Sequence, residues 1–220
     1  MGNIKIGRIV LGVYGTNCYF LYREGENKVI IVDAPDYGDS ICANMEKNGF
    51  QVAGVLLTHG HFDHIWGAGK LRTAASESAE KRGEQPVRVY AAEEERELLM
   101  DTNMNVSAAM KRPCSFKADV YVRDGDVITI AGMTFRVLLT PGHTSGSCCY
   151  YFEEAGFLLC GDTIFLESVG RTDFPTGSMS ALVRSVKEKL FILPDDTKLY
   201  PGHGEATTVG HEKKYNPFLV

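Results

Sequence analysis

Three short, well-separated segments of this sequence concentrate side chains that can bind metal ions. Residues 59–64 read His-Gly-His-Phe-Asp-His, a later segment contains His143, and the last contains His203, with Asp162 between those two. Imidazole nitrogens and carboxylate oxygens are common ligands of zinc and related ions. So many of these groups at such short spacing exceed what core packing or surface chance would supply. The segments predict a pocket that holds two metal ions and activates water.

The spacing within residues 59–64 suits two neighbouring ions. His59 and His61 are two residues apart, so in an extended segment both imidazoles face one ion, and Gly60 lets the chain turn tightly between them. Asp63 and His64 follow where the chain should turn into a helix, and they can face a second ion. A catalytic zinc ion takes three protein ligands and keeps one position for water. The candidate ligands for two ions that share one carboxylate are His59, His61, Asp63, His64, His143, Asp162 and His203.

The isolated ligand candidates carry little weight one at a time. A lone Gly-His such as Gly142-His143 is usually part of a loop, the same holds for His203, and Asp162 alone could form a turn or a helix cap. The prediction depends on the cluster at residues 59–64, with three histidines and one aspartate. His211 has no companion motif, and we expect it on the surface.

Length and composition favour one soluble domain spanning residues 1–220. An apolar fraction of 44% is ordinary, and a formal charge of -5 with interspersed signs disfavours a nucleic-acid partner. No run approaches 18 apolar residues, so neither a transmembrane helix nor a membrane partner is expected. The first residues lack the apolar core of a signal peptide. We therefore expect a cytoplasmic protein with reduced cysteines, and the sequence does not predict its oligomeric state.

Runs of β-branched and aromatic residues between Gly-rich turns predict many strands. Strands are expected at residues 4–10, 17–22, 28–32, 52–57, 87–90, 120–122, 127–130, 134–139, 147–152, 157–160 and 199–200. Helices are expected at residues 39–48, 65–82, 93–100 and 179–190, and a loop over the site at residues 104–118. The hairpin expected at residues 127–139 disfavours a single parallel Rossmann sheet. Two sheets packed face to face, with helices outside, fit the order of elements better.

The ligand motifs belong to a longer pattern that resembles the metallo-β-lactamase-fold hydrolases. Its parts are Thr-His-x-His-x-Asp-His at 58–64, Pro-Gly-His-Thr at 141–144, Gly-Asp-Thr at 161–163 and Pro-Gly-His-Gly at 201–204. Residues 159–165, 168–173, 207–212 and 216–218 resemble the compact bacterial glyoxalase II-like (hydroxyacylglutathione hydrolase-like) branch. The resemblance covers about residues 17–217. It implies an α/β (α+β) fold, the four-layer αββα sandwich of two mixed sheets flanked by helices.

The resemblance also implies two ligand sets joined by a bridging residue. The ligands of one ion would be His59, His61 and His143. The ligands of the other ion would be Asp63, His64 and His203. The residue that bridges the ions would be Asp162. Two divalent metal ions are therefore the expected cofactors, zinc first, although iron and manganese suit the same donors.

Three further residues match the family pattern outside the ligand set. Asp33, in Val-Asp-Ala at 32–34, matches an early aspartate that supports ligands rather than binding metal. Arg171 and Asp173 match a motif near the site, where either a structural ion pair or a substrate-binding role is open.

The chemistry implied is attack by hydroxide on a carbonyl carbon, with Asp63 as the catalytic residue that orients the nucleophile. Metal binding lowers the pKa of water from 15.7 to roughly 7. A thiolate leaves easily because a thiol has a pKa of about 8.5, so a thioester is preferred to a peptide or lactam. Asp162 also stands where several true β-lactamases have Cys or Ser. The expected substrate is S-lactoylglutathione or another hydroxyacyl-thiol.

Two features of the sequence leave alternatives open. Only 17 residues follow His203, so the C-terminal helical domain with which full-length glyoxalase II enzymes contact glutathione is not expected. The run Gly-Arg-Thr-Asp-Phe at 170–174 is shared with persulfide dioxygenases, whose single iron uses positions matching His59, His143 and Asp162. The alternatives are thus a mononuclear-iron persulfide dioxygenase, a metal-dependent nuclease and a non-catalytic binding module.

Overall fold

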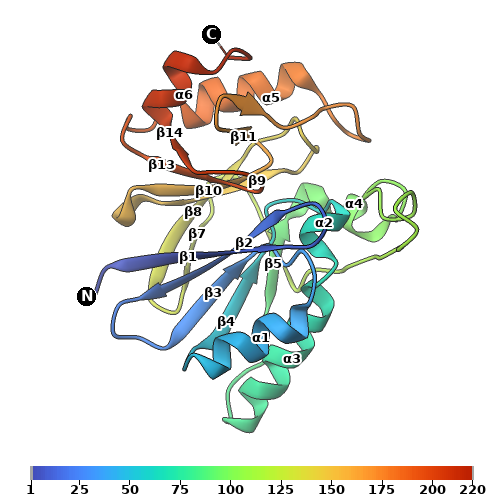
Figure 1. Ribbon diagram of the computed structural model, residues 1–220, viewed down its shortest axis with the longest axis vertical. Helices are drawn as coiled ribbons and strands as arrows, with labels where there is room; N and C mark the ends of the chain where they lie inside the picture. Colours follow the sequence, from blue (N-terminus) through green and yellow to red (C-terminus); the bar gives the residue numbers. More distant parts are fainter. Residues whose placement is uncertain (1, 220) are drawn as a thin grey trace.

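The computed structural model describes residues 2–219 and contains two six-stranded mixed sheets (Figure 1). The first sheet has the order β1-β2-β3-β4-β5-β6. Its strands are β1 (Ile4–Leu11), β2 (Thr16–Arg23), β3 (Lys28–Val32), β4 (Gln51–Leu56), β5 (Val89–Ala92) and β6 (Val120–Val122). Strands β1 to β3 pair antiparallel, and β3 to β6 pair parallel. The carboxyl ends of β3, β4 and β5 therefore meet at one edge of this sheet.

The second sheet has the order β14-β13-β10-β9-β8-β7. Its strands are β7 (Val127–Ile130), β8 (Met133–Leu139), β9 (Cys148–Phe152), β10 (Phe157–Gly161), β13 (Lys198–Pro201) and β14 (Thr207–Thr208). Strands β10 and β13 are parallel, and β8 runs in the same direction because both β8 and β10 are antiparallel to β9. A separate ribbon is formed by β11 (Ile164–Phe165) and β12 (Ser168–Val169).

Helices cover the outer face of each sheet, as Figure 1 shows. The first sheet is covered by α1 (Gly38–Lys47) and α3 (Ala68–Lys81), and the second by α5 (Met179–Ser185), the π-helical turn Val186–Leu190 and α6 (Val209–Tyr215). Alternation along a strand sends neighbouring side chains to opposite faces. Ile30 packs between the sheets, whereas Ile31 packs against α1 and α3. Three apolar layers thus separate four layers of structure, and the predicted αββα sandwich is confirmed.

The predicted helix at residues 65–82 is wrong in one respect, because the chain breaks at Trp66 and Gly67. A short α2 (Phe62–Ile65) precedes the break, and α3 follows it. The Gly67 N–H donates to the Ala34 carbonyl at 2.8 Å, and a Cβ at Gly67 would lie 2.9 Å from that oxygen. This contact ties the loop after β3 to the start of α3. Short elements that the sequence analysis did not predict are β11, β12, β14 and α6.

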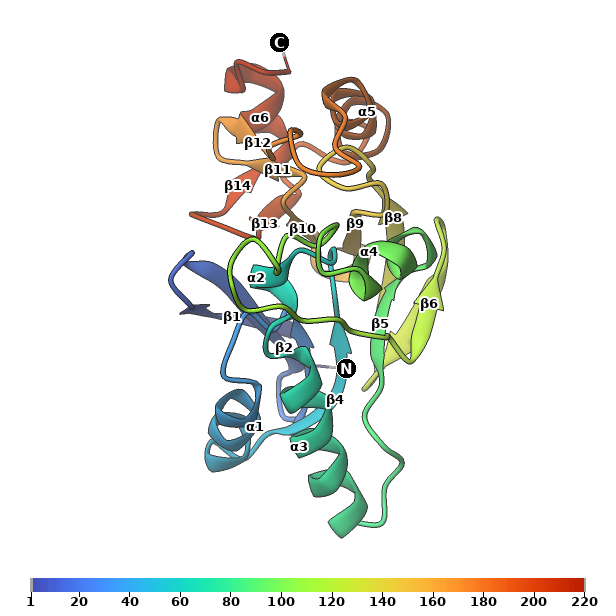
Figure 2. The same cartoon turned by 90° about the vertical axis from the view of Figure 1, so that its right-hand side faces the viewer.

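One edge of the sandwich brings the two sheets together. The Asn17 N–H in β2 donates to the Gly202 carbonyl after β13 at 2.7 Å, and Thr16 pairs with His203 as an isolated bridge. Loops after β3, β4, β5, β8, β10 and β13 all reach this edge, and Figure 2 shows α2 and α4 (Arg96–Met100) lying over it. Among the residues that the structure describes, no helix has the length and apolarity needed to cross a membrane.

Candidate metal centre

The seven predicted ligands come from four separate strand ends at this edge of the sandwich. The loop after β4 carries His59 and His61, and the first turn of α2 carries Asp63 and His64. The other three follow β8, β10 and β13, and they are His143, Asp162 and His203. Because these strands belong to both sheets, the site exists only where the sheets meet.

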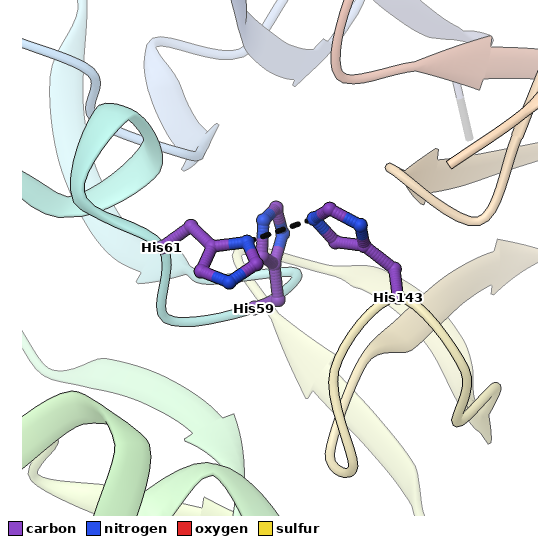
Figure 3. Close-up of side chains that lie close together, drawn as sticks. All are labelled: His59, His61 and His143. Carbon is purple, nitrogen blue, oxygen red and sulfur yellow. Dashed lines mark hydrogen bonds between the residues drawn. The ribbon is translucent and has the colours of Figure 1, made fainter. Parts of the chain in front are cut away.

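The first ligand group consists of His59, His61 and His143, whose candidate ligand atoms all lie within 4.8 Å of one another. Figure 3 shows the three rings turned toward a common point. His61 Nδ1 and His143 Nε2 are 2.8 Å apart, and the His59 ring centroid is 4.7 Å from that of His143. All three residues are buried.

The second ligand group consists of Asp63, His64 and His203, which meet the same distance limit. Asp63 Oδ2 lies 3.2 Å from His203 Nε2 and 3.7 Å from His64 Nε2. His64 is fully buried, whereas His203 is partly open to solvent.

Asp162 lies between the two groups. Its Oδ2 atom is 3.7 Å from His143 Nε2 and 3.5 Å from His203 Nε2, and its Oδ1 atom is 3.4 Å from His64 Nε2. A third set of close ligand atoms, from His59, His64 and Asp162, takes one residue from each group. One carboxylate can therefore contact ions in both groups.

The donor set fits metal ions because several buried polar atoms of the ligands have no hydrogen-bond partner among the residues that the structure describes. These atoms are His59 Nε2, His61 Nε2, His64 Nε2 and Asp162 Oδ1. Each unsatisfied buried polar atom costs about 1–3 kcal/mol. Divalent cations would satisfy such nitrogens and oxygens.

Burial sets the charge of the first ligand group. It lowers the pKa of His59 well below its ordinary value and lowers the pKa of His61 to about 3. Burial also lowers the pKa of His143. The three imidazoles are thus neutral near pH 7, the form that binds metal. Burial raises the pKa of Asp162, but the neighbouring histidines outweigh that effect and hold it well below the ordinary value.

Asp33, predicted to support the ligands, lies at the end of β3, contacts His64 directly and reaches His59 through Thr58. His64 Nδ1 lies 2.8 Å from Asp33 Oδ2, so His64 turns its Nε2 atom toward Asp63 and Asp162. The Thr58 hydroxyl donates to the same Asp33 oxygen at 2.8 Å and lies 3.2 Å from His59 Nδ1. A left-handed backbone at Asp33, with φ of 58°, places the carboxylate between these groups.

The structure gives Arg171 and Asp173 different positions relative to the site. The backbone carbonyl of Arg171 lies 2.7 Å from His143 Nδ1, which fixes the ring so that Nε2 faces Asp162. The guanidinium pairs with both Asp173 oxygens at 2.7 Å and stacks on Phe174. The two side chains thus form an ion pair, and a substrate-binding role stays a prediction. Arg171 also lines the pocket beside the ligands.

Sequence reasoning missed three residues that hold ligands or ligand loops in place. Thr16 donates through its hydroxyl to Asp63 Oδ2 at 3.0 Å. Thr58 contacts Asp33 and His59, as described above. The buried Glu95 binds the backbone of two ligand loops. Thr58 could have been noticed because it adjoins the first motif, but Thr16 and Glu95 are distant in sequence and belong to no pattern.

The ligands open into a pocket of about 550 Å³ with largely apolar walls. The wall residues outside the ligand set include Tyr14, Phe62, Met110, Phe165, Val169 and Phe174. Met110 comes from the predicted loop at residues 104–118, which thus reaches the site. Gly202 borders the ligands closely, because a Cβ there would lie 2.2 Å from Asp162 Oδ1. Any side chain at that position would enter the ion site.

The fold and the ligand pattern agree with comparisons to known proteins. The sequence matches the metallo-beta-lactamase superfamily over residues 11–203. The chain therefore belongs to this superfamily of metallo-hydrolases, and the predicted superfamily is confirmed.

Individual relatives resemble the chain along nearly its whole length. The hydroxyacylglutathione hydrolase GloC of Haemophilus influenzae is 30% identical over 220 residues, which are 99% of this chain and 98% of GloC. The crystal structure of the BLEG-1 B3 metallo-beta-lactamase has a TM-score of 0.85 and 32% identity, covering 98% of this chain and all of that one (100%). ETHE1 from Myxococcus xanthus has a TM-score of 0.78 and 26% identity, covering 98% of this chain and 84% of that one.

Proposed function

We propose that this protein is a thioesterase of the hydroxyacylglutathione hydrolase type, with two zinc ions and a hydroxyacyl-thiol such as S-lactoylglutathione as substrate. The observation that carries the proposal is Asp162, whose Oδ2 atom faces both His143 and His203. Two complete ligand groups joined by one carboxylate suit a pair of ions. The similarity to GloC supports the thioester class.

Different residues of the chain would have different roles in the reaction. Divalent ions bound here would supply hydroxide at neutral pH and polarise the substrate carbonyl. Asp63, held by the Thr16 hydroxyl, orients the nucleophile. The neutral imidazoles add no positive charge of their own, and Asp162 remains ionised. The aromatic walls of the pocket bind the apolar part of the substrate and exclude bulk water.

The pocket also supports a leaving group that needs no protonation. Among the described residues that line it, the carboxylates are Asp63 and Asp162, and the Arg171 guanidinium is paired with Asp173. Outside the ligands, the remaining proton donors of that lining are the hydroxyls of Ser168 and of Tyr14, which donates to Met110 Sδ at 3.0 Å, so neither is a strong general acid. A thiolate leaves without one, whereas the nitrogen of an amide or lactam must be protonated. This favours thioesters over the lactams suggested by the similarity to BLEG-1.

A mononuclear-iron persulfide dioxygenase is the second candidate. The similarity to ETHE1 favours it, and His59, His143 and Asp162 lie together as a set of two histidines and one carboxylate. The second ligand group counts against it, because one iron on the first set would leave Asp63, His64 and His203 without a metal.

One experiment separates these candidates. Purified protein is analysed for metal content and assayed with S-lactoylglutathione, acyl thioesters of other thiols, a β-lactam and glutathione persulfide. We expect about two ions per chain and thiol release from thioesters. His61→Ala and Asp63→Ala should abolish that turnover while circular dichroism remains that of a folded protein. One iron per chain with oxygen uptake, or wild-type thioesterase activity in either variant, would overturn the proposal.

A further inference from the structure

A buried carboxylate outside the ligand set lies between the two loops that carry the first ligand group. Glu95 ends a 3₁₀ turn (Glu93–Glu95) directly after β5, and it is 1% exposed. Strand β5 is parallel to β4, so the chain after β5 emerges beside the loop that carries His59 and His61. Among the described residues, no lysine, arginine or histidine forms an ion pair with this carboxylate. A carboxyl group buried in such a place requires another explanation.

Each Glu95 oxygen accepts hydrogen bonds from a different ligand loop. Oε2 accepts from the backbone N–H of Gly60, between His59 and His61, at 3.2 Å. Oε1 accepts from the Gly146 N–H at 3.1 Å and from the hydroxyl of Thr144, which directly follows His143. A carboxylate is acceptor-only, so it matches a set of donors alone.

The two loops approach Glu95 so closely that only glycine fits at the contact points. A Cβ at Gly146 would lie 2.5 Å from the Glu95 backbone nitrogen, and a Cβ at Gly60 would lie 3.0 Å from Oε2 and 2.7 Å from Leu98 Cδ2. Interiors packed at this density transmit displacement. A shift of the carboxylate would therefore move the loops that carry the ligands.

We propose that Glu95 is a positioning residue for metal binding, which holds the His59–His61 loop and the His143 loop in register so that their imidazoles converge. It contacts neither ion and takes no part in the reaction. The inference does not depend on the proposed substrate, because His59 and His143 serve a hydrolase and a dioxygenase alike.

Glu95→Gln tests the proposal, with Glu212→Gln as its matched control. The amide NH₂ of glutamine would face either the Gly60 or the Gly146 N–H, so one loop loses its acceptor. Glu212 is also fully buried, and it accepts hydrogen bonds from the Glu167 N–H and the Thr207 hydroxyl. None of its hydrogen bonds involves the His59–His61 loop or the His143 loop, so its substitution reports the cost of a buried amide away from the first ligand group.

The measurement is titration of metal-stripped protein with Zn²⁺ against a chromophoric chelator, together with thermal unfolding. We expect Glu95→Gln to lose roughly 10- to 100-fold in affinity for one zinc equivalent, the range for residues that orient ligands. The zinc equivalent that is weakened in Glu95→Gln should be the same one that His61→Ala no longer binds. Glu212→Gln should lower the Tm and keep both affinities.

Wild-type affinities in Glu95→Gln, or an equal loss in Glu212→Gln, would overturn the proposal. If Glu95→Gln does not fold, Thr144→Val decides, because it removes one donor and leaves the carboxylate. In Thr144→Val, a smaller loss of zinc affinity that is confined to the same equivalent supports the positioning role of Glu95. Unchanged zinc affinities refute it. Neither result depends on thioester turnover, so failure of the proposed function is separately visible.

Discussion

The two ligand groups lie side by side but differ in burial and charge. In the first, His59, His61 and His143 are 1%, 2% and 3% exposed. In the second, the side chains of Asp63 and His203 are 13% and 28% exposed. The first group offers only neutral imidazoles, whereas the second adds a carboxylate. We infer that the more deeply buried first group holds its ion more tightly and that the second group exchanges its ion more readily.

The supports of the two groups differ in the same way. The first group depends on Glu95, a carboxylate with hydrogen bonds but no cation, and on the Arg171 carbonyl. The second depends on the Thr16 hydroxyl and on Asp33, which faces His64. The comparison teaches that one centre can combine a rigid, buried ion site with a more open one.

The largest effect is expected from removing the residue that the two groups share. Asp162→Ala deletes the oxygen between His143 and His203 and leaves two cations without the intervening negative charge. We expect both zinc affinities to fall by more than about 100-fold, the upper value for residues that only orient ligands, and turnover to be lost. Elemental analysis and thioester assays measure this. Retention of either ion at wild-type affinity would show that the groups are independent.

A smaller effect is expected on the pH dependence of stability, and it comes from Glu95, which supports the first group and has no cationic partner among the described residues. Burial raises the pKa of Glu95 from 4.5 to about 7. Between these values the folded state holds a proton that the unfolded chain releases, so the free energy of unfolding falls as pH rises through this window. The shift of this pKa corresponds to a change of about 3 kcal/mol in the free energy of unfolding.

Urea unfolding of metal-stripped protein at pH 5 and pH 8 checks this. We expect the stability of wild type relative to Glu95→Gln to decline by about that amount between the two pH values, because glutamine does not titrate. Parallel pH profiles for the two proteins would contradict the shift.

The smallest effect on zinc affinity is expected from two matched variants, each of which removes one threonine hydroxyl beside a ligand. Thr58→Val removes the hydroxyl beside His59 Nδ1, and Thr16→Val removes the donor to Asp63. Both threonines are buried, so the two changes are alike in size. We expect Thr16→Val to cost roughly 10-fold in affinity for the zinc equivalent of the second group alone. Thr58→Val should weaken both equivalents, because its hydroxyl also donates to the Asp33 oxygen that faces His64. Zinc titration measures both, and an even loss over the two equivalents in Thr16→Val would contradict the division into groups.

The ligand motifs were predictable because most of the ligands are close together in the sequence. His59, His61, Asp63 and His64 occupy one strand end and the turn that follows, and the alternation of strands and helices predicted two sheets with outer helices. Strands β3 and β4 are short, nearly continuous apolar runs because both of their faces are buried, and a sequence displays such runs directly.

The supports were not predictable, because their roles arise only where distant segments meet. Glu95 acts through backbone N–H groups of two loops, and backbone donors leave no trace in residue type. The break at Gly67 likewise depends on the Ala34 carbonyl, which reaches it from another strand end. Two-residue strands such as β11 and β14 are too short for any periodicity to appear.

The pairing of Asn17 with Gly202 across the edge of the sandwich has a thermodynamic consequence. Ligands after β4 belong to one sheet and those after β8, β10 and β13 to the other, so an ion can be held only when both halves of the chain are docked. Ion concentration then acts on global unfolding, by about 2.7 kcal/mol at one hundred times Kd. On the proposed function, supply of the ion would set the equilibrium between folded and unfolded chain as well as the activity.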